Sequence, residues 1–260
     1  MSSAAAVTPE HRQFVHTLAE ASGAVIRPYY AAPDLAVESK SDATIVTRAD
    51  RDAEACMREL ITRHFPGHGI LGEEYGKENA DAEFVWVLDP IDGTLSFAHG
   101  SPLFGTLIGL LHQGQPVLGA IHQPVLGQLC VGDGVATTRD GRPVRVRATA
   151  ALADAVLCTT DLGSVDEYQD LARFDGLRRQ VKLFRTWGDC YGYLLLASGF
   201  IDAMVDPIVN PWDVLPLIPV VRGAGGVITT WDGGDPVEGA SCVAAAPGVH
   251  APVLAALAGG

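Results

Sequence analysis

The feature that most constrains this chain is an apolar run over residues 84–88 that ends abruptly in acidic residues. The run continues directly into Asp89-Pro90-Ile91-Asp92-Gly93-Thr94. Five consecutive apolar residues predict a buried strand, and the proline and glycine that follow predict a turn into a short helix beginning at Asp92 and running to about residue 99. Two carboxylates three residues apart across such a turn can converge on one point.

Two interpretations of this stretch stand side by side. Asp-Pro and Asp-Gly are ordinary turn formers, and Asp92 can simply cap the short helix. Alternatively, both carboxylates and the Ile91 carbonyl face one point, where the first helical N–H groups offer an anion site. The second arrangement suits a divalent metal beside a phosphate.

Other acidic residues occur in the same kind of position. Glu73 and Glu74 end a short apolar piece over 69–72, and Asp213 follows a predicted strand over 201–205 and two prolines. Paired acids usually lie on solvated surface, but repetition of the pattern favours one shared site. Carboxylate ligands with no His or Cys at comparable spacing favour a hard cation, magnesium or manganese, over zinc.

Charge and cysteine content narrow the partners and the compartment. A net charge of −13 argues against nucleic acid or an anionic membrane surface as the main partner. An anionic substrate would therefore need metal ions. Five cysteines with no C-x-x-C pair predict buried free thiols in a reducing, cytoplasmic compartment. No apolar run approaches the ~20 residues needed to cross a membrane.

The order of predicted elements indicates a layered α/β fold. Helical periodicity over 9–26 and 49–64 precedes glycine-punctuated strands over 103–131, which predict an antiparallel meander. After an arginine-rich connector over 139–147, strands alternate with helices, one of them predicted over 167–179. We expect two lobes, residues 1–143 and 144–260, with the site in the cleft between them.

Three motifs together resemble the inositol monophosphatase family of metal-dependent, lithium-sensitive phosphatases. They are Gly72-Glu73-Glu74, the stretch over 89–94, and Trp212-Asp213 followed by the glycine-rich segment 223–226. The resemblance implies an αβαβα sandwich that commonly forms homodimers. It also implies two or three Mg²⁺ ions, with Mn²⁺ as a substitute, and a set of ligands in which Asp89 is shared: Glu73, Asp89, the Ile91 carbonyl, Asp92 and Asp213.

The motif over 89–94 must be distinguished from that of haloacid-dehalogenase phosphatases. Those enzymes also show an Asp…Asp-Gly-Thr motif, but their two aspartates are two residues apart, whereas Asp89 and Asp92 are three apart. We therefore expect no phosphoaspartyl enzyme. In-line attack by a metal-activated water is predicted, since metals neutralise the phosphate oxygens and lower the pKa of the water.

The family's Thr/Asp pair falls on Thr94 and Asp50. By that resemblance Thr94 orients the attacking water and Asp50 accepts a proton through it, although Asp50 equally fits a simple helix cap. The N–H groups of Gly93 and Thr94 would hold the phosphate. Glu74 would support a metal-bound water from behind.

The segment 185–193, Arg-Thr-Trp-Gly-Asp-Cys-Tyr-Gly-Tyr, looks like the histidinol-phosphate phosphatase branch. That branch usually has lysine where Leu95 stands, which is a departure. The resemblance implies a set of substrate contacts: Arg185, Gly188, Asp189 and Asp206. A carboxylate such as Asp189 would favour histidinol phosphate, which carries an ammonium and an imidazole, over neutral inositol. Alternatively, Asp189 only caps a helix that begins near Cys190.

We predict a Mg²⁺-dependent histidinol-phosphate phosphatase of histidine biosynthesis that acts on a small phosphomonoester. The alternatives are an inositol, sugar or 3′-phosphonucleotide phosphatase of the same family and, from another class, a non-catalytic metal-binding protein. Parallel phosphate-release assays separate the first two. A non-catalytic protein would be expected to lack one of the metal ligands or Thr94, whereas this sequence has Thr94 and every expected acid.

Overall fold

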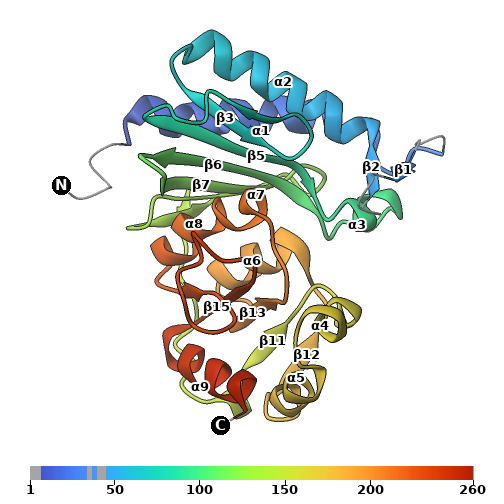
Figure 1. The fold of residues 1–260 in the computed structure, drawn as a ribbon, viewed down its shortest axis with the longest axis vertical. Helices are drawn as coiled ribbons and strands as arrows, with labels where there is room; N and C mark the ends of the chain where they lie inside the picture. Colours follow the sequence, from blue (N-terminus) through green and yellow to red (C-terminus); the bar gives the residue numbers. More distant parts are fainter. Residues whose placement is uncertain (1–6, 34–36, 40–44, 260) are drawn as a thin grey trace.

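The structure, a computed structural model, describes residues 7–33, 37–39 and 45–259. Helices and two large sheets stack in five layers, in the order helix, sheet, helix, sheet, helix (Figure 1). This arrangement confirms the predicted layered α/β class and the αβαβα sandwich. None of the helices in the described part combines the length and apolarity needed to cross a membrane.

The larger sheet is built from eight strands: β3 (Gly69–Gly72), β4 (Gly76–Glu78), β5 (Phe84–Asp92), β6 (Gly105–His112), β7 (Gln115–Gln123), β8 (Gln128–Gly132), β9 (Thr137–Arg139) and β10 (Arg142–Pro143). Their order across the sheet is β10-β9-β8-β7-β6-β5-β3-β4. Strands β3 and β5 pair in parallel, and the other neighbours pair antiparallel. The meander predicted over 103–131 is confirmed as β6, β7 and β8.

Two helices, α1 (Pro9–Ile26) and α2 (Arg48–His64), cover the outer face of this sheet (Figure 1). Each begins with a threonine whose hydroxyl accepts a hydrogen bond from an N–H of the first turn, which satisfies a group that the helix cannot pair internally. Their apolar stripes, including Leu18 and Met57, pack on Trp86 and Leu88 of β5. The short strands β1 (Val37–Ser39) and β2 (Ile45–Thr47) pair with each other beside α2.

The smaller sheet is built from five strands: β11 (Val156–Cys158), β12 (Leu183–Arg185), β13 (Ala203–Asp206), β14 (Val227–Thr229) and β15 (Cys242–Ala245). Their order is β12-β11-β13-β15-β14. Strands β12, β11 and β13 pair in parallel, and β15 pairs antiparallel with both β13 and β14. A 3₁₀ turn, η2 (Leu152–Asp154), leads into β11.

The remaining helices fall into two groups. Between the sheets lie α6 (Asp189–Ala197), α7 (Pro211–Val214) and α8 (Leu217–Gly223), and on the outside of the smaller sheet lie α4 (Leu162–Tyr168), α5 (Leu171–Arg178) and α9 (Pro247–Ala258) (Figure 1). One more short helix, α3 (Thr94–Ala98), follows β5.

The single helix predicted over 167–179 is wrong in its extent. The chain forms α4 and α5 instead, separated by Gln169, whose backbone is extended with φ −140° and ψ −176°. Asp170 then caps the new helix, because its carboxylate accepts the Arg173 N–H at 3.1 Å. A capping aspartate within an otherwise helical pattern started a second helix.

The strands of the larger sheet all come from residues 69–143, and those of the smaller sheet from 156–245. One apolar cluster nevertheless crosses between the sheets. It includes Val87 and Leu107 of the larger sheet, Leu217 and Val220 of α8, and Ala244 of the smaller sheet. The two halves share this core, and the division into lobes at residues 143 and 144 stays a prediction.

Candidate active site

The acidic turn lies at the end of β5, although the strand extends further than predicted. It continues to Asp92, and its pairing with β6 shifts register between Asp89 and Asp92. The Pro90 carbonyl accepts a hydrogen bond from the Thr106 hydroxyl at 2.8 Å, and Asp89 accepts the Ile91 N–H at 3.0 Å. Such a bulge bends the strand and re-aims its side chains. Gly93, with φ +88°, then lets the chain enter α3.

The structure brings Asp213 to this turn from the other half of the sequence. Asp213 lies on α7, where its carboxylate accepts the Asn210 N–H at 2.7 Å. One carboxylate oxygen each of Asp89, Asp92 and Asp213 lies within 4.8 Å of the others. Glu73, which follows β3, lines the same hollow but lies outside this tight group.

The hollow around these carboxylates has a volume of about 610 Å³. Strand β5, helix α3, helix α4 and helix α7 contribute its lining: Glu73, Asp89, Ile91, Asp92, Gly93, Thr94, Leu95, Ser164, Glu167, Tyr168, Asp189, Asn210, Trp212 and Asp213. Among the described residues, neither lysine nor arginine lines it. Within the described part of the chain, the side chains that line the hollow are therefore acidic or uncharged.

The carboxylates repel one another in this buried setting. Burial raises the pKa of Asp89 well above its ordinary value, and the charges of Glu73, Asp92 and Asp213 raise it further. Burial likewise raises the pKa of Asp92, with Asp189 as the next cause, and of Asp213, with Asp92 as the next cause. Oxygen donors that destabilise each other's charge fit a hard divalent cation, which would remove the repulsion.

Asp50 and Thr94 meet although 44 residues separate them. The Thr94 hydroxyl donates to the Ile91 carbonyl at 3.0 Å and lies 3.4 Å from Oδ1 of Asp50. The other oxygen of Asp50 accepts the N–H of Thr47 at 2.8 Å, which closes the capping box of α2. Asp50 thus serves as a cap and faces Thr94 at once. Burial raises its pKa to about 6.

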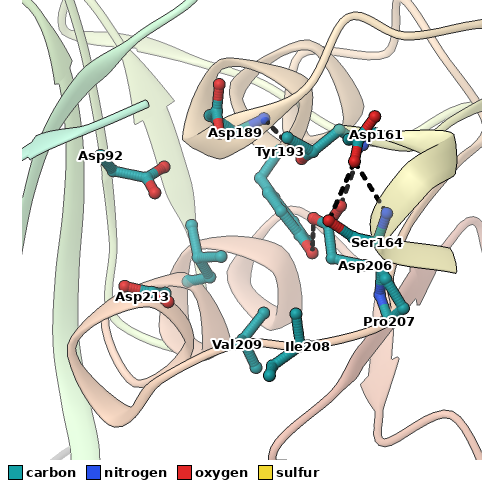
Figure 2. Close-up of a pocket in the computed structure, with 12 residues that line it drawn as sticks. Asp92, Asp161, Ser164, Asp189, Tyr193, Asp206, Pro207, Ile208, Val209 and Asp213 are labelled. Atoms are coloured by element: carbon teal, nitrogen blue, oxygen red, sulfur yellow. Dashed lines mark hydrogen bonds between the residues drawn. The ribbon is translucent and has the colours of Figure 1, made fainter. Parts of the chain in front are cut away.

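A smaller hollow of about 130 Å³ adjoins the first, and Figure 2 shows the side chains around it. Asp92 and Asp213 lie on one side, with Asp206 and Asp161 on the other. Asp206 is held by the Tyr193 hydroxyl at 2.8 Å and the Thr160 N–H at 3.0 Å.

Asp189 begins α6 with φ +49° and lines both hollows. Its carboxylate accepts from the Ser96 hydroxyl at 3.4 Å, while its own N–H donates to the Thr160 hydroxyl at 2.9 Å. The next N–H of the helix, that of Cys190, donates to Asp92. Helix α6 is therefore joined to the acidic turn of β5 by a hydrogen bond between the two halves.

The other predicted substrate contacts occupy different places. Gly188 precedes Asp189 as the N-cap of α6, where a side chain would collide with Thr160. Gly93 lies against the Asp189 carboxylate, since a Cβ there would be 2.7 Å from Oδ2. Arg185 is exposed on β12, lines neither hollow, and donates to the Phe184 carbonyl at 2.7 Å. The structure does not bring Arg185 to the site.

Several lining residues were not predicted from the sequence. Asp161 and Ser164 come from the start of α4, with Glu167 and Tyr168 further along it. A signal existed, because Asp161 follows a strand-like run just as Asp89 does. A further residue, Glu54 on α2, accepts the N–H of Glu74 at 2.7 Å. A glutamate on an amphipathic helix carries no comparable signal.

Fold and site together define a five-layered αβαβα protein with a carboxylate-lined hollow suited to hard cations and phosphate esters. The sequence matches the Inositol monophosphatase family over residues 9–259. The chain belongs to this family, and it is a phosphoric monoester hydrolase.

Individual relatives extend this assignment. The chain is 37% identical to a histidinol-phosphatase from Chlorobaculum parvum over 98% of both chains. It is 44% identical to the chloroplastic bifunctional phosphatase IMPL2 of Arabidopsis thaliana over 84% of its own length, and it spans 63% of that protein. The structure superposes on an inositol monophosphatase from Zymomonas mobilis with a TM-score of 0.84 and 36% identity, covering 95% and 96% of the two chains.

Proposed function

We propose that this protein is a Mg²⁺-dependent histidinol-phosphate phosphatase. The metal ligands would be the side chains of Glu73, Asp89, Asp92 and Asp213 together with the Ile91 carbonyl, holding two or three Mg²⁺ ions, with Mn²⁺ as a possible substitute. What supports this assignment is the donor set: carboxylates that repel one another around one hollow, with no lysine or arginine among the described residues that line it.

The chain's own groups have separate tasks in hydrolysis. Bound Mg²⁺ supplies charge neutralisation for the phosphate and lowers the pKa of the attacking water. The Thr94 hydroxyl orients that water. Asp50 lies 3.4 Å from this hydroxyl and accepts the proton of the water through it. The Gly93 and Thr94 N–H groups hold the phosphate, and Glu74 supports the water from behind the ligands. The water then attacks phosphorus in line, the bond from phosphorus to the substrate oxygen opposite it breaks, and that oxygen takes up a proton from solvent as the alcohol leaves.

The substrate assignment rests on one observation, the charge of the smaller hollow. Five of its lining residues are aspartates: Asp92, Asp161, Asp189, Asp206 and Asp213. Among the described residues, no lysine or arginine lines it. Asp161 lies near the solvent, and its carboxylate accepts hydrogen bonds from the N–H and the hydroxyl of Ser164. Partial burial raises the pKa of Asp161, but these hydrogen bonds outweigh it and lower the pKa, so the side chain stays anionic. A leaving group that carries an ammonium and an imidazole fits this wall better than a neutral polyol.

Parallel assays test this substrate. Phosphate release from L-histidinol phosphate and from inositol 1-phosphate is measured at saturating Mg²⁺, and we expect a higher kcat/KM for the former. Asp189→Asn should reduce the preference by raising the KM for histidinol phosphate alone. Equal or reversed rates would instead support the alternative, an inositol monophosphatase, which the similarity to the Zymomonas mobilis structure favours.

We also propose a cytoplasmic homodimer that is inhibited by lithium and acts on a small phosphomonoester without nucleic-acid or membrane partners. The net charge of −13 supports the last point. Sedimentation of the purified protein tests the dimer, and a lithium titration of its activity tests the inhibition.

A further inference from the structure

The turn that carries Glu73 and Glu74 is held from outside the hollow by one residue of α2. Glu54 is completely buried, at 0% exposure. One oxygen of its carboxylate accepts the Glu74 N–H at 2.7 Å, and the other accepts the Tyr75 N–H at 3.2 Å. Two successive backbone N–H groups therefore end on a single buried carboxylate.

Arg58, one helical turn further along α2, neutralises this carboxylate. Its Nε donates to Glu54 at 2.8 Å, and the same guanidinium donates to the Gly76 carbonyl at the far end of the turn. It also lies 3.4 Å from Glu78 of β4. A buried ion pair contributes little net stability, because desolvation offsets the attraction, whereas it can select one geometry. The pair thus clamps both ends of the turn to α2.

Gly72 shows how closely the turn approaches the clamp. A Cβ at this position would lie 2.0 Å from the Glu54 carboxylate and 2.8 Å from the Arg58 guanidinium. Any side chain would push the turn away from α2. On its other side, the Glu73 N–H donates to the Leu88 carbonyl at 3.1 Å, immediately before Asp89. The Glu73 backbone is fixed between β5 and α2.

We infer that Glu54 is a positioning residue that, with Arg58, sets the place of Glu73 toward Asp89 and so tunes cation affinity. The inference rests on the proposed metal site. Asp50 and Glu54 lie four residues apart on the same face of α2, both fully buried. One helix therefore supports the hollow twice, through Asp50 to Thr94 and through Glu54 to the Glu73 turn.

The test is a calorimetric titration of Mg²⁺ into the full-length protein without substrate. Glu54→Gln should weaken binding about 10-fold to 100-fold, as loss of a group that orients a metal ligand does. At saturating Mg²⁺ its kcat should approach the wild-type value, which separates a positioning role from a catalytic one. The matched control is the exposed i,i+4 pair of the same helix, altered as Glu59→Gln/Arg63→Met. Its Mg²⁺ affinity should not change.

Glu54→Gln removes the buried carboxylate that pairs with Arg58, and this can prevent folding, so Glu54→Gln/Arg58→Met is the second variant. It removes both charges and should also bind Mg²⁺ more weakly. A folded variant with lower Tm but wild-type Mg²⁺ affinity would overturn the inference while leaving the proposed activity intact. A wild-type protein that binds Mg²⁺ but does not hydrolyse histidinol phosphate would reject only the substrate. A wild-type protein that takes up no Mg²⁺ would overturn both.

Discussion

Asp189 occupies a backbone conformation that few side chains adopt, with φ +49°. Asparagine and aspartate tolerate this region better than other residues with a Cβ, and strain of this kind is often retained at functional sites. The conformation places the carboxylate against Gly93, at the junction of the two hollows. Substitution of Asp189 therefore changes the charge at this junction, and its effect can be measured on both stability and substrate preference.

Asp189 should make the stability of the metal-free protein depend on pH. Burial, and next the charge of Asp206, raises its pKa from 3.8 to about 7. Because the folded value is the higher one, the contribution of this group to stability is lost as pH rises through that range. Asparagine does not titrate, so the Tm advantage of Asp189→Asn over the wild type should grow from pH 4 to 7 and then level off, as measured by differential scanning fluorimetry in EDTA. Asp166→Asn, on the exposed side of α4, is the control. A Tm difference between Asp189→Asn and the wild type that does not change with pH would contradict the prediction.

Thr94 should matter to turnover more than to folding. Thr94→Ala removes the hydroxyl between Ile91 and Asp50, so we expect kcat to fall about 100-fold or more at saturating Mg²⁺. Thr94→Ser keeps the hydroxyl and should retain most activity. Phosphate release from histidinol phosphate measures both, with Thr17→Ala, a partly exposed position on α1 outside the hollow's lining, as the control. Near-normal turnover by Thr94→Ala would remove Thr94 from the mechanism.

At the scale of elements, the segment between the two sheets is tied down by one buried carboxylate. Asp202, which directly precedes β13, is 0% exposed. It accepts hydrogen bonds from Arg147 at 3.1 Å, from the Thr149 hydroxyl at 2.7 Å and from the Val156 N–H at 2.7 Å. The end of the arginine-rich connector predicted over 139–147 is therefore anchored to the smaller sheet before β11 begins.

Removing this anchor should destabilise the protein. Asp202→Ala leaves the Thr149 hydroxyl and the Val156 N–H without a partner, at an expected cost of about 2–3 kcal/mol in the free energy of unfolding. Urea denaturation monitored by tryptophan fluorescence measures it. Arg147 is partly exposed, so Arg147→Met should cost less than Asp202→Ala. If both variants unfold at the wild-type midpoint, the anchor has no energetic importance.

For the whole molecule, the site is a junction between the two halves of the chain. Asp89 and Asp92 come from the larger sheet and Asp213 from α7, and the Cys190 N–H of α6 donates to Asp92. Charges that repel across this junction weaken the metal-free fold, and a cation bound there would hold the halves together. Stability and metal binding should therefore be linked.

Mg²⁺ should raise the Tm of the wild-type protein and EDTA should lower it. Mass action predicts a gain of about 2.7 kcal/mol when free Mg²⁺ is 100 times its Kd. Asp92→Asn removes a central negative charge, so the variant should gain little from Mg²⁺ and be more stable than the wild type in EDTA. Thermal scans across a Mg²⁺ series measure both effects. Equal Mg²⁺ responses in the two proteins would show that Asp92 does not bind the ion.

Local patterns in the sequence were sufficient to predict the elements that carry the acids. Helical and alternating periodicity led to α1, α2 and the meander, because burial of one face imposes that spacing on each segment separately. The break between α4 and α5 was missed because Asp170, the cap, resembles any surface aspartate within a helix. Strands β14 and β15 were also not predicted.

By itself the sequence determined which chemistry was available: oxygen donors at strand ends, a threonine beside them, and no basic side chain nearby in the motifs. Only the tertiary structure decided which donors meet. It set Asp213 within 4.8 Å of Asp89 and Asp92, left Arg185 outside, and placed Glu54 under the Glu73 turn. The physical reason is that residue type and local periodicity arise from short-range interactions, whereas convergence depends on how two sheets and their shared core pack.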